Sequence, residues 1–327
     1  MSDESTDRDG SGIGDAATPV AEAPVSAEVD PTGTPGRMRK AFGALVRFRR
    51  RMKRYPWLPL LIVVGLLIVP AVFADFLTPH DPLRGILGDR LKPPMWLDGG
   101  TSEYPLGTDK LGRDMLTRLM YGARISLVVG SITVFVGTVI GGTLGMLAGY
   151  LGGVVDKVVT WLIDTFLSLP VVLLALVIVA AIGPSFITII SIISLTIWAI
   201  FARVVRGETL SIREKDYVAR AKVAGVGSFR ILSRYILPNL ANTLIVLATL
   251  QVGVVILGEA SLSFIGAGIP RPNPSWGVMV ADGRDNVLTQ WWLTVFPGMA
   301  ILLVVMSLNL MGDWLRDFLD PKLRQQA

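Results

Sequence analysis

The chain has 327 residues, of which 51% are hydrophobic and only 17% are charged, and its mean hydropathy is +0.56. This composition exceeds what the core of a soluble domain requires and excludes an ordinary water-soluble protein. The net charge of +5 does not indicate nucleic-acid binding, because the basic residues gather beside apolar runs. The chain has no cysteine and one histidine, His80, which excludes disulfides and a Cys/His metal cluster.

The N-terminal part of the chain lacks a membrane segment. Residues 1–36 are rich in Ser, Thr, Ala, Pro, Gly and Asp and carry no aromatic residue. They cannot bury enough apolar surface to offset chain entropy, so we expect a disordered tail. Residues 37–56 form a juxtamembrane segment with nine basic side chains and no acidic one. Because short basic flanks tend to stay in the cytoplasm, this segment predicts a cytoplasmic N-terminus.

Six apolar stretches are long enough to cross about 30 Å of hydrocarbon as helices. They predict an all-α membrane domain over 57–322, followed by a C-terminal tail at 323–327. An even number of spans puts both termini in the cytoplasm, together with the basic 206–239 loop between the fourth and fifth spans. The stretches lie at 57–74, 125–149, 158–182, 186–205, 240–258 and 291–312.

Three of these spans carry features beyond their length. Four glycines of the second span recur every fourth residue and share one helical face, which predicts a close-packed seam with another helix. In the third span we expect Asp164 to pair with a nearby Arg or Lys, and the helix to bend at Pro170. Glu259, at the outer end of the fifth span, predicts either a hydrogen bond to the following turn or a contact on a substrate path. The four glycines are Gly137, Gly141, Gly145 and Gly149.

The segment 105–114, ahead of the second span, is expected to be a loop with two glycines and alternating acidic and basic residues. The apolar residues from Met115 onward have helical spacing, which predicts a short interfacial helix. We expect exposed ion pairs of low strength here, forming a structural clasp or a surface that contacts substrate. The expected pairs are Asp109 with Lys110 or Arg113, and Asp114 with Arg118.

Residues 216–239, DYVARAKVAGVGSFRILSRYILPN, predict two short charged helices between apolar spans. A membrane protein that keeps such a helix in water offers it to a partner. Gly225 permits a sharp turn between the two helices, and Pro238 precedes the next span. The first helix begins at Asp216 and presents Arg220 for contact with an acidic rim. Its residues expected to make apolar contacts are Tyr217, Val218, Ala221 and Ala224.

This segment resembles the coupling loop of ABC importer permeases, whose pattern is E-A-A-x3-G-x9-I-x-L-P. Gly225, Leu237 and Pro238 match that pattern, whereas Ala219, Arg220 and Tyr235 stand in place of Glu, Ala and Ile. A second likeness, to permeases of the dipeptide, oligopeptide and nickel importer class, covers most of the chain from 57 to 322. It is carried by Pro105–Asp114, Arg118, Tyr121–Arg124, Pro274–Gly277 and the Leu319-Asp320-Pro321 motif.

The resemblance implies six transmembrane helices, with a cytoplasmic coupling helix between spans four and five. It implies a non-catalytic subunit of the cell membrane that works with a second homologous permease, two cytoplasmic ATPase subunits that bind ATP and Mg, and an extracytoplasmic solute-binding protein. Short peptides are the favoured substrate, with nickel or another small solute as the alternative. The coupling loop would dock the ATPases, and the binding protein would contact the surface that includes Asp109, Arg113, Asp114 and Trp276.

Two other function classes find less support in the residues themselves. An enzyme needs a nucleophile, a base and an orienting group, and the sequence shows no such set and no G-x-x-x-x-G-K-[ST] phosphate loop. An ion-coupled secondary transporter favours inverted repeats and ionisable residues at the membrane midplane. Spans two, four and six have no charged residue near their middle.

Overall fold

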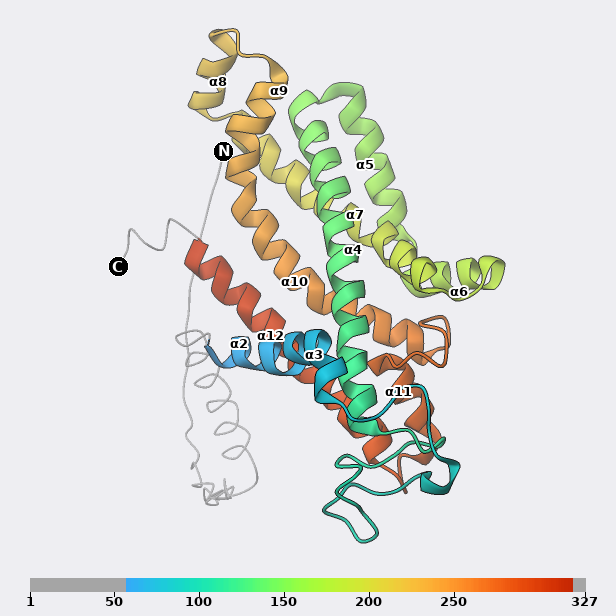
Figure 1. Cartoon of the computed structure of the whole chain (residues 1–327). Coiled ribbons are helices and arrows are strands. Elements are labelled where there is room, and N and C mark those ends of the chain that lie inside the picture. The colour runs from blue at the N-terminus through green and yellow to red at the C-terminus, as the bar shows by residue number, and fades with distance from the viewer. Residues whose placement is uncertain (1–56, 320–327) are drawn as a thin grey trace, which may run out of the picture. The chain divides into compact units, whose positions relative to one another are not determined.

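The computed structural model describes residues 57–319, which belong to one compact unit. The predicted tail 1–36, the basic segment 37–56 and the C-terminal tail lie outside the described residues. Helices and connecting loops make up the described range (Figure 1). The helices are α2 (Trp57–Ile62), η1 (Val63–Ile68), α3 (Val69–Leu77), η2 (Leu87–Asp89), α4 (Met115–Leu151), α5 (Gly153–Ser168), α6 (Val171–Ile182), α7 (Phe186–Arg213), α8 (Asp216–Val223), α9 (Ser228–Ile231), η3 (Leu232–Ile236), α10 (Leu237–Phe264), α11 (Trp276–Gly283), η4 (Arg284–Asn286) and α12 (Trp292–Leu319).

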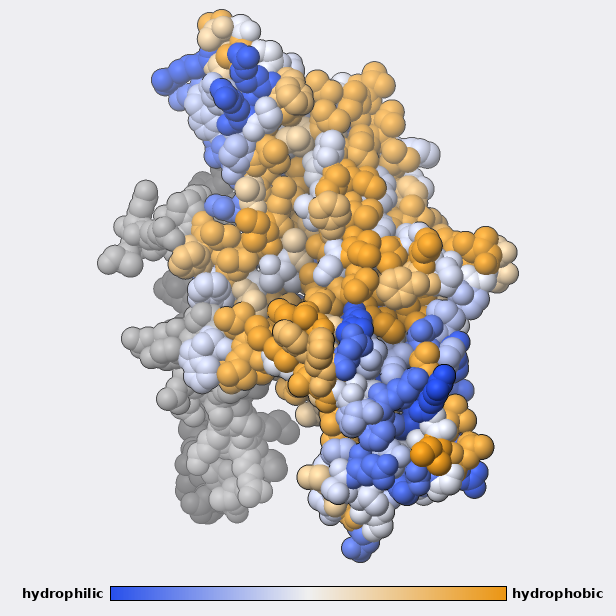
Figure 2. Space-filling view, viewed as in Figure 1, coloured by the Kyte–Doolittle hydropathy of each residue, from blue (hydrophilic) through white to orange (hydrophobic). Residues whose placement is uncertain are grey.

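The described residues contain five continuous helical segments that are long and apolar enough to cross a membrane, and α5 with α6 makes a sixth if the bent pair is one span. This arrangement confirms the predicted all-α membrane fold. Figure 2 shows hydrophilic side chains gathered around α8 and around the loops near α11, with hydrophobic surface between them. We call these two regions the α8 end and the loop end. The continuous segments are 57–77, 115–151, 186–213, 228–264 and 292–319.

The third predicted span, 158–182, is not one straight helix. It is divided into α5 and α6, whose axes differ by 84°. Leu169 has an extended backbone, with φ −83° and ψ 123°. Pro170 follows, also extended, and α6 begins after it. Proline lacks an N–H and pushes the preceding residue out of the helical region, which explains the break. The predicted bend at Pro170 is therefore confirmed, and α5 and α6 together remain one candidate span.

Two other predicted boundaries were wrong because helices continue where a break was expected. The predicted short interfacial helix is the first part of α4, which runs unbroken from Met115 into the second span. The second helix of the 216–239 segment likewise runs from α9 through η3 into α10. Pro238 is tolerated there because the preceding turn, Leu232–Ile236, is a wider π-helical turn, and such local adjustment accommodates a residue without an N–H.

The four glycines of α4 form the predicted seam, and their partner is α7. A Cβ atom added to Gly141 would lie 2.2 Å from the carbonyl oxygen of Trp198, and one added to Gly145 would lie 2.4 Å from that of Ala202. The two backbones therefore approach too closely for any side chain between them. Because α7 leads directly to α8, this seam fixes α4 to the helix that supports the predicted partner-binding segment (Figure 1).

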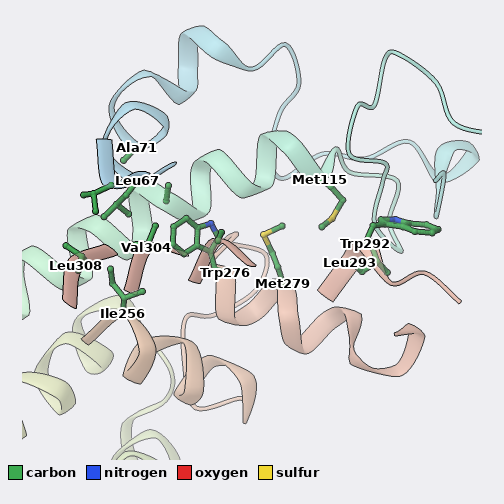
Figure 3. Close-up of a cluster of buried hydrophobic side chains, with 13 residues drawn as sticks. Leu67, Ala71, Met115, Ile256, Trp276, Met279, Trp292, Leu293, Val304 and Leu308 are labelled. Carbon is green, nitrogen blue, oxygen red and sulfur yellow. The ribbon is translucent and has the colours of Figure 1, made fainter. Parts of the chain in front are cut away.

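A hydrophobic core lies toward the loop end and joins η1 and α3 to α4, α10, α11 and α12. Figure 3 shows Leu67, Trp276, Val304 and Leu308 converging on this cluster. Trp276 packs over Gly122 of α4, where an added Cβ would lie 2.6 Å from the indole Cδ1 atom. This packing holds the short helix α11 against the membrane helices and positions the loops around it.

Candidate functional site

The turn between α8 and α9 is closed by backbone hydrogen bonds around a left-handed glycine. Gly225 has φ +73°. Its N–H donates to the Lys222 carbonyl oxygen at 3.0 Å, and the Val226 N–H donates to the Ala221 carbonyl oxygen at 3.0 Å. These two bonds form a Schellman motif, which ends a helix and reverses the chain over a few residues. The predicted sharp turn at Gly225 is confirmed, and we call residues 216–236 the coupling hairpin.

The inner face of the coupling hairpin packs on its own chain. Val218 and Ala221 are buried, with 0% and 6% of their surface exposed. Their neighbours belong to the adjoining ends of α7, α9, η3 and α10. The sequence assigned both residues to a partner contact, whereas the structure places them in this internal cluster. The other members of the cluster are Val205, Ile212, Ile231, Leu232, Ile236 and Leu240.

The outer face of the hairpin combines exposed apolar and basic side chains. Val223 and Phe229 are 92% and 84% exposed, and Tyr217 is 38% exposed. Arg220 is exposed on the same helix, and Asp216, Ala224 and Pro238 are also exposed. An exposed aromatic and aliphatic surface beside basic groups can bind a partner that offers an apolar cleft with an acidic rim. The docking role of these residues stays a prediction.

Sequence reasoning missed Val223 because it could not choose between the two faces of the short helix α8, and it did not consider Phe229, which lies on α9. Positions 218 and 221 are spaced for one face, and positions 217, 220 and 223 are spaced for the other. Both faces carry apolar residues. The choice depends on the internal cluster described above, which is formed by residues from distant parts of the chain. The exposed charge at Arg220, on the same face as position 223, was the available signal.

At the loop end, a buried cluster of charges confirms one predicted ion pair and corrects the other. Asp109 accepts a hydrogen bond from Arg113 Nε at 2.7 Å and lies 3.5 Å from Arg118 Nε. Asp109, Arg113 and Arg118 are exposed by only 7%, 6% and 2%, so the pairs are not the exposed ones expected. We call these three residues the loop-end clasp. The structure shows no Asp114–Arg118 ion pair within the described residues.

Asp114 instead caps α4. Its carboxylate accepts hydrogen bonds from the N–H groups of Leu116 and Thr117 and from Thr117 Oγ1. The capping bonds occupy both oxygens of the Asp114 carboxylate, and Arg118 lies beside Asp109 instead. Asp114, which the charge pattern assigned to an ion pair, therefore caps the helix that begins at Met115.

The loop ahead of the clasp is ordered by a further polar contact. The Tyr104 hydroxyl donates to Asp89 at 3.2 Å, and Lys92 Nζ lies 2.7 Å from the same carboxylate. The hydrogen bond from Lys92 lowers the pKa of Asp89. Burial, followed by the hydrogen bond to Asp89, raises the pKa of Tyr104 to about 12. Tyr104 therefore stays a hydrogen-bond donor throughout the physiological pH range.

Two other predicted site residues are buried at this end. Trp276 is 1% exposed, and its Nε1–H donates to the Leu119 carbonyl oxygen at 2.9 Å. Glu259 is 0% exposed and accepts a hydrogen bond from Ser263 Oγ at 2.6 Å, which confirms the expected bond to the following turn. Their present contacts are structural, and their roles toward a binding protein or on a substrate path stay predictions.

A pocket of about 530 Å³ opens beside the loop-end clasp. Its walls come from the segments around Asp109, the loop after α10, and the α11–η4 region. Five basic and three acidic side chains line it, so the pocket favours a polar or anionic group. Those side chains are Lys110, Arg113, Arg118, Arg271 and Arg284, with Asp109, Asp282 and Asp285.

Comparison with known proteins places these features in context. The family described as "Binding-protein-dependent transport system inner membrane component" matches residues 141–325. A di/tripeptide transport system permease protein, DppC of Pseudomonas aeruginosa, is 41% identical and covers 82% of this chain and 88% of its own length. The dipeptide transport system permease protein DppC of Escherichia coli is 43% identical, over 81% of this chain and 88% of its own. A structure of the MetNI methionine ABC transporter in inward-facing conformations covers 63% of this chain and 98% of its own, with 17% identity and a TM-score of 0.52, a likeness of fold alone.

Proposed function

The chain belongs to the family of binding-protein-dependent transport system inner membrane components, and from this premise we propose that it is one permease subunit of an ATP-driven importer of short peptides. It is a multi-pass inner-membrane protein. The proposed assembly contains a second, homologous permease, two ATPase subunits that bind ATP and Mg, and an extracytoplasmic binding protein. ATP hydrolysis resides in the partner subunits.

One observation carries the proposal, namely the two faces of the coupling hairpin. Its inner face is locked onto α7 and α10 through Val218 and Ala221, and its outer face presents Tyr217, Val223 and Phe229 to a partner. A surface that transmits movement needs both properties, because a hairpin without internal packing would yield when pushed. ATP-driven closure of the partner ATPases would thereby bias the transporter between its inward-open and outward-open states.

The proposed orientation puts the α8 end in the cytoplasm and the loop end outside. With α5 and α6 counted as one span, six membrane segments would put both chain termini on the same side of the membrane. The basic flank at 37–56 supports this orientation, because it lies directly before the first membrane segment. The loop-end pocket then faces the side from which a binding protein delivers its cargo.

The peptide substrate is supported by the relatives, which are di/tripeptide and dipeptide transport permeases. Nickel chelates and other small solutes are the alternative cargo within the same importer class. Specificity in such an assembly also depends on the binding protein, so the substrate must be tested with the complete complex.

The first experiment purifies the tagged chain in gentle detergent, identifies the proteins that accompany it, and reconstitutes the complex in proteoliposomes. We expect a second permease and ATPases to co-purify, and dipeptide to be taken up when ATP and loaded binding protein are present. Uptake of nickel or another solute, but not of peptide, would overturn the substrate. Recovery of a folded chain without an ATPase partner, even after crosslinking in the native membrane, would overturn the importer assignment.

The docking surface is tested by two substitutions and a matched control. Val223→Asp and Phe229→Asp each place a charge on the outer face of the hairpin, and we expect both to release the ATPases while the chain still inserts. The control is Leu288→Asp, which changes an apolar residue that is 96% exposed at the loop end. If all three variants retained the ATPases equally, the outer face of the hairpin would not be the docking surface.

A further inference from the structure

Two ion pairs join α5 to α7, and they are built differently. Arg206 binds Asp156 through two guanidinium nitrogens, and the two side chains are 29% and 23% exposed. Arg203 binds Asp164 through one hydrogen bond of 2.6 Å, and these side chains are 56% and 63% exposed. The first pair has the geometry of a structural clasp. The second is an open pair whose charged groups face outward from the helices.

The open pair has exposed polar neighbours on membrane helices, and we call these residues and the pair the polar stripe. Asp164, Thr165 and Ser168 are exposed along α5, and Arg203 and Ser211 are exposed on α7. Charged side chains are costly in hydrocarbon and usually face protein or a water-filled cavity. Figure 2 shows the hydrophobic surface that is typical between the two ends of this chain. The ion pair departs from that pattern, and because Val158 and Trp161 are also exposed on this side of α5, the surface is of mixed character.

An exposed face of α4 shows the contrast. Its exposed residues include Ile132, Phe135 and Val139, whose spacing puts them on one side of the helix. Side chains of this kind suit contact with lipid tails. Two helices of the same domain therefore present surfaces of different character, one apolar and one carrying a complete ion pair.

The position of the open pair also indicates a path across the membrane. At about 1.5 Å per residue, Asp164 lies about 16 Å from the start of α5, and Arg203 lies about 15 Å from the end of α7. Asp164 is also little more than one turn before the break at Leu169 and Pro170. Broken backbone at membrane depth is tolerated where it is buried in protein or lines a cavity. The pair and the break together mark a polar wall.

We propose that Asp164 and Arg203 form a binding station on the translocation path for the two charged ends of a peptide. The peptide's ammonium group replaces Arg203 on Asp164, and its carboxylate replaces Asp164 on Arg203. This inference rests on the proposed function, because it requires a peptide as cargo. It adds a binding site within the membrane domain, and it explains why Asp164 and Arg203 are charged.

The exchange is favourable only for a ligand that carries both signs of charge. One ion pair is replaced by two, so no charge is left without a partner inside the membrane domain. A ligand with one charged end would leave Asp164 or Arg203 without a partner after the exchange, so it gains less than a ligand that pairs with both. The station therefore admits zwitterionic peptides and disfavours peptides with blocked ends. The pair of Asp156 and Arg206 is held by two hydrogen bonds and is less exposed, so it serves as the internal comparison.

The absence of cysteine from the chain makes a direct test possible. Thr165→Cys introduces a single thiol beside Asp164, and Phe135→Cys introduces one on the apolar face of α4. The complex of permeases and ATPases, in lipid nanodiscs, is treated with a membrane-impermeant methanethiosulfonate reagent, and labelling of this chain is read by mass spectrometry. We expect Thr165→Cys to react and Phe135→Cys to stay unlabelled. Excess dipeptide should slow the reaction at position 165, whereas the same dipeptide with an acetylated N-terminus and an amidated C-terminus should not.

Three results of the labelling experiment would overturn the station. An unreactive Thr165→Cys places the stripe in lipid or against the second permease. A reactive thiol that dipeptide does not protect places it in water, away from the substrate. Equal protection by the free and the blocked dipeptide shows that the charged ends are not what is bound. None of these results depends on folding of a charge-neutralised variant.

Uptake measurements provide a second test of the binding station. Asp164→Asn and Arg203→Gln should lower dipeptide uptake per ATP hydrolysed by about tenfold or more, the factor given by loss of one modest interaction. Asp156→Asn is the structural control and should lower thermal stability without lowering uptake per folded complex. If Asp164→Asn and Asp156→Asn behaved alike, the station would be only a second clasp. If the wild-type complex failed to take up peptide at all, the proposed function would fail instead.

Discussion

The α4–α7 seam makes a sharp prediction, because adjacent glycines of α4 face different surroundings. Gly141→Ala puts a methyl group 2.2 Å from the Trp198 carbonyl oxygen, which is backbone and cannot rotate away. Gly142→Ala puts the same group 3.7 Å from Leu244 Cδ2, an ordinary van der Waals distance. Both changes raise helix propensity by about 1 kcal/mol, so that term cancels in their difference. We expect the Gly141→Ala variant alone to be destabilised.

The size of the effect follows from the gap that must open. Contacts of a Cβ atom below 3.0 Å are essentially never seen, so α4 and α7 must separate by about 1 Å around Gly141. A gap of about 0.5–1 Å forfeits a quarter to a half of the dispersion energy of the atoms across it. Overpacking of this kind typically costs about 1–3 kcal/mol. At roughly 2–4 °C per kcal/mol for larger domains, the two variants should differ by about 2–12 °C.

The assay is thermal unfolding of each purified variant in the same detergent, followed by size-exclusion chromatography of the protein that stays folded. Apparent melting temperatures are compared at one heating rate, because membrane proteins unfold irreversibly and the comparison is then kinetic. Gly141→Ala should melt below Gly142→Ala and below the wild type. Equal melting of the two alanine variants would show that the seam is not close-packed, and the reasoning from glycine spacing would fail.

Three further substitutions test the loop end by thermal or denaturant unfolding. Asp109→Asn leaves two buried guanidinium groups without a carboxylate and should cost about 3–5 kcal/mol, whereas Asp81→Asn, which breaks an exposed pair of 3.5 Å, should cost about 0–1 kcal/mol. Asp114→Ala should cost about 0.5–2 kcal/mol through loss of the α4 cap, and Asp114→Asn should restore most of it; a neutral Asp114→Ala would contradict the capping role. Trp276→Phe should cost at least about 0.5–1.5 kcal/mol through loss of its indole hydrogen bond, and the exposed Trp161→Phe should be neutral; equal effects would contradict the anchoring of α11.

The membrane class, the helix content and the glycine seam could be predicted because each depends on local composition or spacing. A run of about 20 apolar residues defines a span wherever it occurs. Glycines at every fourth residue share a face of α4 whatever helix packs there. The identity of the partner, α7, could not be predicted, because it depends on contacts between segments far apart in the sequence.

The details of the sites were predicted less well, and the reason differs between the two ends. At the α8 end the sequence did not show which face of α8 is buried, since Val218 and Val223 are both apolar and only the internal cluster decides between them. At the loop end the predicted partner of Asp114 was wrong. Asp114 has two available roles, capping and ion pairing, and burial of the Asp109 cluster selects the first. The Gly225 turn was predicted correctly because its left-handed backbone is a requirement of a single residue.

The structure also indicates how a push on α8 would reach the proposed station. Val218 and Ala221 fix α8 to the adjoining end of α7, and the glycine seam fixes α7 to α4. These three helices should therefore move as one body. The Asp164–Arg203 pair is held by one hydrogen bond close to the break after α5, so relative movement is expected there rather than in the seam. A Cβ atom added at Gly141 would lie 3.0 Å from the backbone nitrogen of Ala202, the residue next to Arg203. Gly141→Ala and Arg203→Gln should therefore be coupled, and the melting temperature of the double variant should depart from the sum of the two single effects.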